Sequence, residues 1–294
     1  MTYTLTDDIT TVGIIIERDN IILDGNGYTV RGVGEFEGII LANRRNVIVR
    51  NLKVENFEIG IHVIESSNIT ITGNTIRNND IVGIRLDNSS GNTITGNTIA
   101  GNNQGGIYLD NSSGNTITGN ILSNNNVGIY LDNSSGNRVF LNNFSNYSQV
   151  YSEYYYYSVY SVNVWDDGSR GNFWSDYKGS DVNNDGVGDT PYTIDEMNVD
   201  RYPLIRPICP YEVFSVKVSS PYGTTSVSGV ELVRLRVLEG ELEKVKGYLS
   251  RLEEEWRRGT VSTHAYEILK KEYQAKIEQL ESEVKKIKER IGQG

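Results

Sequence analysis

A short stretch of sequence recurs through the first half of the chain with a period of about 23 residues. Its landmark is a glycine followed by isoleucine, at Gly13, Gly38, Gly60, Gly83, Gly106 and Gly128. Between the landmark glycines the sequence is nearly the same in successive units, as a comparison of residues 86–97 with residues 109–120 shows. A repeat of this kind requires every unit to fold alike and to bury its apolar residues against its neighbours.

Each unit alternates short β-branched stretches with clusters of Asn, Gly and Ser, which is typical of short strands joined by tight turns. If each unit closes one coil, the strands of successive coils pair in parallel at ~4.8 Å. The inward residues then form a continuous core, represented by Ile84, Leu86, Ile94 and Ile99. A leucine-rich repeat needs a helical half, and a propeller blade is nearly twice as long. We therefore predict a mainly β fold, a right-handed parallel β-helix of about six coils over residues 1–164, with amides such as Asn97 and Asn120 stacked between coils.

Period-two alternation places every second strand residue on the outer surface. It predicts one outward column of His62, Arg85, Tyr108 and Tyr130 and a second of Ile64, Asp87, Asp110 and Asp132. Tyrosine rings pack on the apolar faces of sugars, and carboxylates accept hydrogen bonds from sugar hydroxyls. The predicted ligand-binding residues are Arg85, Asp87, Tyr108, Asp110, Tyr130 and Asp132. The alternative is an ordinary strand surface, on which tyrosine and aspartate are common.

Catalysis on this face would require more than a column of similar carboxylates. Glycan hydrolysis needs two carboxylates of different character, yet the three aspartates lie in nearly identical sequence contexts. A lyase needs a basic group beside a neutralised uronate, for which Arg85 is the one candidate in these columns. We expect His62 to be a surface residue, and we assign no catalytic residue.

An Asp-rich segment, 165–206, follows the repeats. Within it Asp181, Asn183, Asp185 and Asp189 occupy positions one, three, five and nine of a calcium-loop pattern, with Gly186 at position six. Tyr192 stands where a bidentate Glu normally closes the site, so Asp195 or Glu196 would have to complete it. We predict a structural calcium site that pins a capping module over the end of the β-helix, with a plain Asx–Gly turn as the alternative.

Four ordered motifs, at 165–168, 171–179, 181–192 and 200–204, accompany the repeats. Together they resemble the NosD-like family of periplasmic copper-site maturation proteins and the broader carbohydrate-binding and sugar-hydrolase (CASH) β-helix domains, over roughly residues 10–206. The resemblance implies a secreted or cell-surface β-helix, with copper delivery in one branch and polysaccharide contact in others. Copper sites use Met, Cys and His, and the chain has two Met, one Cys and two His, all scattered. The residues therefore argue against copper.

The C-terminal part changes character after a linker at 207–229. Residues 230–294 carry two heptad seams, from Leu235 to Trp256 and from Leu269 to Ile291, separated by a break at 257–262. This predicts an antiparallel helical hairpin. Because a two-helix hairpin is rarely stable alone, we expect it to form a homo-oligomer or to bind a protein partner. A charged spacer is the alternative.

Composition excludes some function classes. A net charge of −10 opposes binding to nucleic acid, and no apolar run is long enough to span a bilayer. The first residues lack the pattern of a signal peptide. We predict a non-enzymatic extracellular or cell-surface protein that binds a glycan or another surface and oligomerises through its hairpin. The alternatives are a polysaccharide lyase or hydrolase, a surface-layer or filament component, and an accessory protein for copper-site maturation.

Overall fold

The computed structural model describes residues 1–152, 161–208 and 263–291, with isolated positions between 242 and 258. The chain divides into two units, Met1–Pro210 and Tyr211–Gly294. Most of the predicted linker, residues 153–160 and Cys209 lie outside the described residues.

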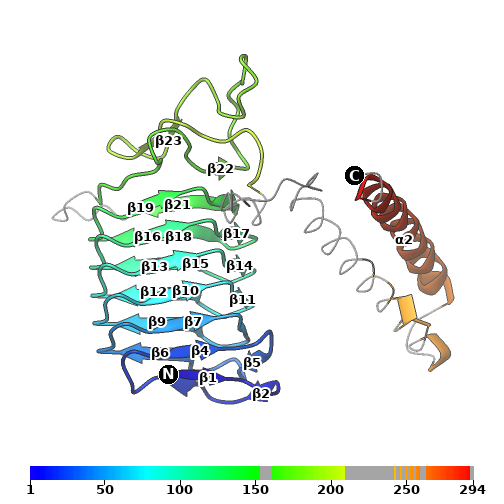
Figure 1. Cartoon of the computed structure of the whole chain (residues 1–294), viewed down its shortest axis with the longest axis horizontal. Helices are drawn as coiled ribbons and strands as arrows, with labels where there is room; N and C mark the ends of the chain where they lie inside the picture. The colour runs from blue at the N-terminus through cyan, green and yellow to red at the C-terminus, as the bar shows by residue number, and fades with distance from the viewer. Residues whose placement is uncertain are drawn as a thin grey trace, which may run out of the picture. The chain divides into compact units, whose positions relative to one another are not determined.

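The first unit is a parallel β-helix with three sheets running along its length (Figure 1). Sheet A contains β1 (Thr2–Thr4), β4 (Ile22–Asp24), β7 (Ile48–Arg50), β10 (Thr70–Thr72), β13 (Thr93–Thr95), β16 (Thr116–Thr118) and β19 (Arg138–Phe140). Sheet B contains β2 (Ile9–Thr10), β5 (Thr29–Arg31), β8 (Lys53–Glu55), β11 (Thr75–Arg77), β14 (Thr98–Ala100), β17 (Ile121–Ser123), β20 (Asn143–Ser145) and β22 (Phe173–Trp174). Sheet C contains β3 (Ile14–Ile15), β6 (Glu37–Ala42), β9 (Ile59–Ile64), β12 (Val82–Asp87), β15 (Gly105–Asp110), β18 (Val127–Asp132) and β21 (Ser148–Ser152). The predicted fold is confirmed.

The coil number differs from the prediction. There are about seven coils rather than six, because the coil formed by β19, β20 and β21 has Gln149 where the others have the landmark glycine. The landmark is glycine for a steric reason: a Cβ on Gly106 would lie 2.7 Å from the carbonyl oxygen of Gly128 on the next coil. In the seventh coil, the Gln149 side chain accepts a hydrogen bond from the Asn146 backbone N–H at 3.1 Å.

The predicted core positions stack from coil to coil. Ile84 and Leu86 pair in register with Ile107 and Leu109 of the next coil, and all four are fully buried. Every coil therefore contributes the same apolar positions to one continuous core. This arrangement gives the outer face of each sheet a fixed register, which positions the surface residues considered below.

Polar ladders line the turns inside the β-helix, as predicted for Asn97 and Asn120. In the first ladder each Nδ2 donates to the Oδ1 of the next residue at 2.9–3.0 Å. Its members are Asn74, Asn97, Asn120, Asn142 and Asn172, and parallel ladders run through Asn79, Asn102, Asn125 and Asn146 and through Asn92, Asn115, Asn137, Asn163 and Asn198. These amides satisfy backbone groups that the tight turns would otherwise bury without partners.

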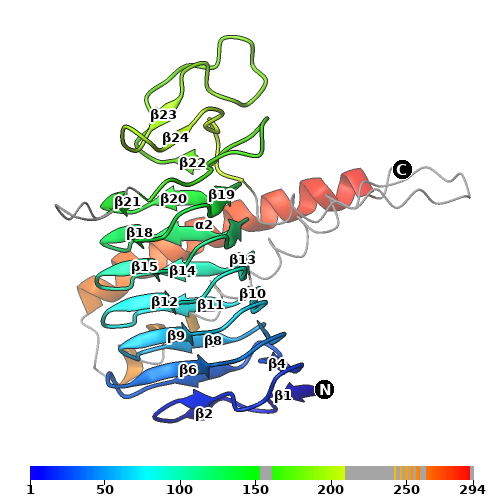
Figure 2. The ribbon, with the colours of Figure 1, turned by 90° about the vertical axis from the view of Figure 1, so that its left-hand side faces the viewer.

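Residues 161–208 rest on the last coil (Figure 2). Strand β22 pairs with β20, and the two-stranded sheet of β23 (Tyr192–Thr193) and β24 (Val199–Asp200) lies beyond it. Trp174 is 1% exposed and is stacked between Phe144 and Tyr192, with ring centroids 4.5 and 4.3 Å away. The aromatic residues of this segment thus cover the end of the core.

Carboxylates end two of the amide ladders. The Asn172 backbone N–H donates to Asp200 Oδ2 at 2.7 Å, and Asn198 Nδ2 donates to Asp195 at 2.9 Å. The last asparagine of each ladder has N–H donors, but no further coil follows that could supply an acceptor. Because an ionised carboxylate only accepts hydrogen bonds, it suits this position.

The second unit contains one continuous described helix, α2 (Thr263–Ile291). Leu242 packs against its residues Leu280, Val284 and Ile287, and Trp256 stacks on Tyr266 with centroids 4.5 Å apart. Most of the first arm of the predicted hairpin lies outside the described residues, so the hairpin stays a prediction. No helix in the described part of the chain is both long and apolar enough to cross a membrane.

Candidate functional site: the outer face of sheet C

The two predicted surface columns lie on the outer face of sheet C with the predicted register. His62, Arg85, Tyr108 and Tyr130 pair on consecutive strands, as do Ile64, Asp87, Asp110 and Asp132. The first column continues to Ile40 on one side and to Tyr151 on the other. The face therefore changes along the axis from apolar to charged and then to aromatic.

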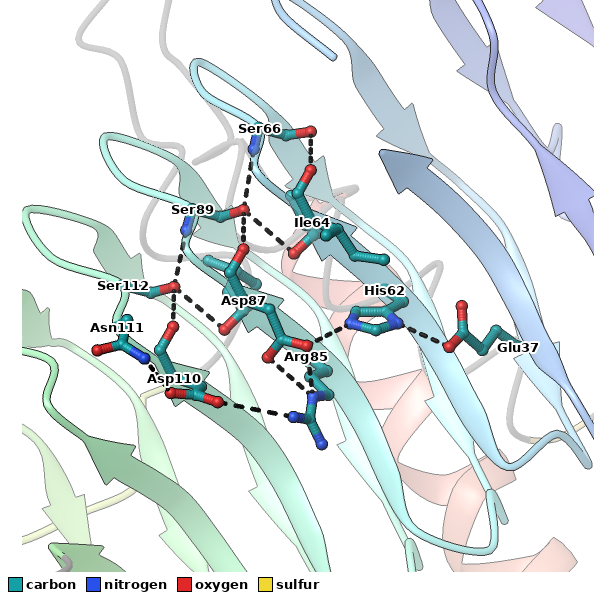
Figure 3. Close-up of polar contacts among 12 residues, drawn as sticks. Glu37, His62, Ile64, Ser66, Arg85, Asp87, Ser89, Asp110, Asn111 and Ser112 are labelled. Carbon is teal, nitrogen blue, oxygen red and sulfur yellow. Dashed lines mark hydrogen bonds and ion pairs between the residues drawn. The ribbon is translucent and has the colours of Figure 1, made fainter. Parts of the chain in front are cut away.

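His62 is not the exposed residue that the sequence suggested. It is 7% exposed and lies between two carboxylates (Figure 3). Its Nε2 is 2.8 Å from Asp87 Oδ2, in hydrogen-bonding geometry. Its Nδ1 is also 2.8 Å from Glu37 Oε1, but that contact lacks the alignment of a hydrogen bond. The repeat pattern gave no sign of this cluster, because Glu37 stands just before a landmark glycine, at a position that other coils fill differently.

Arg85 connects the charged and aromatic parts of the face. Its Nε lies 2.8 and 2.9 Å from the two oxygens of Asp87, and its Nη2 lies 3.8 Å from Asp110 Oδ2. Its guanidinium carbon is 4.9 Å from the centroid of the Tyr108 ring, within the range of a cation–π contact. Asp87 thus has two basic partners, Arg85 and His62.

Asp110 has a different environment from Asp87. Burial, followed by repulsion from the Asp132 and Asp87 carboxylates, raises its pKa above the ordinary range. Arg85 and the Asn111 amide, which donates to Asp110 at 2.7 Å, oppose that rise. No hydrogen bond or ion pair reaches the Asp132 carboxylate from the described residues. Nearly identical sequence contexts therefore produced carboxylates with different partners, which the repeat alone did not reveal.

The aromatic part is a ladder of three tyrosines. The Tyr108 and Tyr130 ring centroids are 5.5 Å apart, and those of Tyr130 and Tyr151 are 4.9 Å apart. Tyr108 and Tyr130 are partly buried, and Tyr151 is 44% exposed. Tyr151 was not predicted as a member because its coil lacks the landmark glycine, although its spacing from Tyr130 is close to one repeat.

The predicted calcium ligands converge on one exposed turn. Asp181 accepts hydrogen bonds from the backbone N–H groups of Asp185 and Gly186 at 3.1 and 2.9 Å, and Asp189 accepts one from Val182 at 2.9 Å. Asn183 Nδ2 donates to Asp185 at 2.9 Å.

Tyr192, at the closing position, and Asp195, one of the residues considered in its place, make other contacts. Tyr192 packs on Trp174 in the cap, and Asp195 ends an amide ladder. Among residues 1–152, 161–208 and the described part of the second unit, no group of three His, Cys, Asp or Glu side chains is placed to hold a metal ion. Calcium binding at Asp181, Asn183, Asp185 and Asp189 stays a prediction.

Titration calorimetry tests the predicted calcium binding. We expect calcium to bind weakly, with a dissociation constant on the order of 10⁻⁴–10⁻³ M, the range of extracellular sites with incomplete ligand sets. The double substitution Asp181→Ala/Asp185→Ala should abolish the heat, and magnesium should give none, because it requires a stricter octahedral geometry. An intact chain that shows no heat at millimolar calcium would leave the loop as a plain turn.

The described residues do not fit a copper site. The one histidine whose side chain is described, His62, has both ring nitrogens against carboxylates. Met1 and Met197 are 73% and 50% exposed and lie far apart in the sequence. Copper(I) and copper(II) require clustered sulfur or imidazole donors, and these positions do not supply them.

Comparison with known proteins places this fold in a family. The model of the family described as "Periplasmic copper-binding protein (NosD)" matches residues 2–179. The probable ABC transporter binding protein NosD of Stutzerimonas stutzeri is 52% identical over 46 residues, which are 14% of this chain and 10% of that protein. The chain therefore matches only about a tenth of that curated relative.

Among solved structures, a point mutant of the periplasmic alginate epimerase AlgG is 26% identical, with a TM-score of 0.44, over 48% of this chain and 35% of that one. Another AlgG structure is 22% identical, with a TM-score of 0.41, over 49% and 38%. The family match extends over more than half of the sequence and includes all seven coils. The chain belongs to the NosD family of parallel β-helix proteins.

Proposed function

We propose that the outer face of sheet C binds a glycan without cleaving it, and that the protein works outside the cytoplasm. The observation that carries the proposal is the tyrosine ladder, Tyr108, Tyr130 and Tyr151, whose first two rings have Asp110 and Asp132 beside them on the same strands. The periplasmic description of the family supports the location.

The physical basis is a rigid amphipathic platform. Aromatic faces pack against the apolar faces of sugar rings, and the comparable contact between two aromatic rings is worth about 0.5–1.5 kcal/mol beyond the area that it buries. Carboxylates accept charge-assisted hydrogen bonds from hydroxyls. Two of the tyrosines stand on strands that pair on both sides, and the third stands on the edge strand beside them. The backbone is therefore already ordered, so binding costs little conformational entropy.

A glycan array tests the proposal with the full chain, the double variant Tyr108→Ala/Tyr130→Ala, and Tyr147→Ala as a matched control. Tyr147 is 92% exposed and lies in a turn, outside the ladder. We expect the double variant to lose at least about tenfold in affinity, the equivalent of two modest aromatic contacts, and the control to bind like the unmodified chain. Equal binding by all three proteins would refute the tyrosine site.

A polysaccharide lyase or hydrolase is the second candidate. It is favoured by one observation: Asp87 is paired with Arg85 and His62, whereas burial and like charge raise the pKa of Asp110. Glycosidases use two carboxylates that differ in this way. Sugar products released in the array wells, and lost in Asp110→Asn, would replace the binding proposal with this one. Failure to bind any glycan, together with assembly into extended arrays, would favour the structural surface-layer role.

We also propose that residues 230–294 mediate self-association. The apolar face of α2 that includes Leu280, Val284 and Ile287 is covered in part by Leu242, and an isolated helical pair is rarely stable without a further partner. In sedimentation, the full chain should be heavier than its 32.9 kDa monomer, whereas a chain ending at Ser228 should be monomeric. Monomeric behaviour of both proteins would rule the proposal out.

A further inference from the structure

We infer that the glycan is a linear amino-sugar polymer that lies along the β-helix axis with about one sugar ring per coil, its protonated amines beside Asp110 and Asp132. This inference rests on the proposed glycan binding and adds the charge of the ligand to it. It follows from how charge and aromatic rings are distributed on the outer face of sheet C.

The balance of charge on this face is negative. Three carboxylates, those of Asp87, Asp110 and Asp132, stand in one column beside the column that holds His62 and Arg85. A fourth carboxylate, that of Glu37, pairs with Ile59 outside these two columns and contacts His62. His62 contacts Glu37 and Asp87, and the closest contacts of Arg85 are also with Asp87.

The uncompensated charge lies at one end of the row. Asp110 retains a single ion-pair contact, at 3.8 Å, and in the described structure Asp132 has none. Negative charge therefore accumulates beside Tyr108 and Tyr130. The raised pKa of Asp110, caused by burial and then by the Asp132 and Asp87 charges, has the same physical origin. A cationic ligand would relieve this repulsion.

The spacing of the rings suits a polymer. Successive tyrosine centroids lie 5.5 and 4.9 Å apart, close to the ~4.8 Å rise between parallel strands. This rise is comparable to the length of one pyranose unit in an extended β-1,4-linked chain. Tyr108 and Asp110 stand two residues apart on one face of β15, and Tyr130 and Asp132 do so on β18. A sugar packed on each tyrosine would place a ring substituent near the neighbouring carboxylate in both coils.

The same arrangement disfavours acidic polymers. A uronate chain in this position would bring one carboxylate per ring toward Asp110 and Asp132, and like charges at this separation repel. An N-acetylated chain has the same shape as the amine form but no charge. The amine and acetylated chains, which share one backbone, therefore separate the electrostatic contribution from the aromatic one.

Titration calorimetry on the full chain would compare a glucosamine hexamer, an N-acetylglucosamine hexamer and a galacturonate hexamer, at a mildly acidic pH where the amines are protonated and aspartates are ionised. We expect the glucosamine hexamer to bind about tenfold more tightly than the acetylated one, as two partly exposed ion pairs allow, and the galacturonate hexamer to bind most weakly. Asp110→Asn/Asp132→Asn should remove the preference for the amine and keep the binding of the acetylated chain. Tyr108→Ala/Tyr130→Ala should weaken the binding of both.

Two further outcomes separate the inference from the proposed function. Equal binding of the amine and acetylated hexamers, or tighter binding of galacturonate with or without calcium, would overturn the amino-sugar inference and leave glycan binding intact. If none of these hexamers binds and the glycan array is also silent, both fail together. Circular dichroism spectra that match the unmodified chain would show that each variant is folded.

Discussion

Replacing Asn97 with alanine is expected to lower the free energy of unfolding by about 3–5 kcal/mol, because several buried polar groups lose their partners at once. Asn97 is 1% exposed. Its Nδ2 donates to the Ile71 carbonyl oxygen and to Asn120 Oδ1, at 2.9 and 3.0 Å. Its Oδ1 accepts hydrogen bonds from the Asn74 backbone N–H and from Asn74 Nδ2 at 2.9 and 3.0 Å. An alanine side chain can make none of these four contacts.

Urea unfolding of the full chain, followed by circular dichroism, measures this loss. Thr95→Ala is the matched control, because Thr95 lies two residues earlier on the outer face of sheet A and is only partly buried. It should cost about 0.5 kcal/mol or less, the usual effect at a surface position. A loss below about 1 kcal/mol for Asn97→Ala would mean that water replaces the amide in the ladder, and the ladder would then contribute little to stability.

Repetition explains why so much of this fold could be predicted. Once one coil is interpreted, the period assigns every equivalent residue, so Ile84 in the core and Tyr108 on the surface determine the positions of their counterparts. The prediction failed where the repeat changes. Gln149 replaces the landmark glycine because the cap, and not another full coil, follows it; both the seventh coil and Tyr151 were missed for that reason.

Contacts made by residues that differ from coil to coil could not be predicted from the repeat. His62 was expected at the surface, yet Glu37 from the preceding coil and Asp87 from the following coil enclose it. All three stand on regular strands, but the other coils have different side chains at the positions of Glu37 and His62. The difference between Asp87 and Asp110 has a similar origin, since only Asp87 has His62 on the preceding coil. Asp195 was considered as a calcium ligand, but it terminates an amide ladder, and that contact depends on how a nonrepetitive loop returns to the β-helix.

The Asp200 carboxylate should make the stability of the β-helix depend on pH. This side chain is fully buried, and burial raises its pKa to about 6, against the opposing effect of hydrogen bonds from the Asn172 backbone N–H, the Trp174 indole and the Tyr202 backbone N–H. The folded state therefore binds this proton more tightly than the unfolded state, whose pKa is near 3.8. The resulting stabilisation is complete below that unfolded pKa and is lost as the pH rises through about 6.

Comparing the chain with Asp200→Asn isolates this contribution, because the asparagine cannot titrate and the other acidic groups are shared. Two pKa units correspond to about 3 kcal/mol. The unfolding free energy of the unmodified chain, minus that of the variant, should thus fall by about 3 kcal/mol between roughly pH 3 and pH 7, as measured by urea unfolding across that range. Parallel pH profiles would instead mean that the pKa of Asp200 is the same in the folded and unfolded states. The N–H donors at the end of the ladder would then offset the cost of burying its charge.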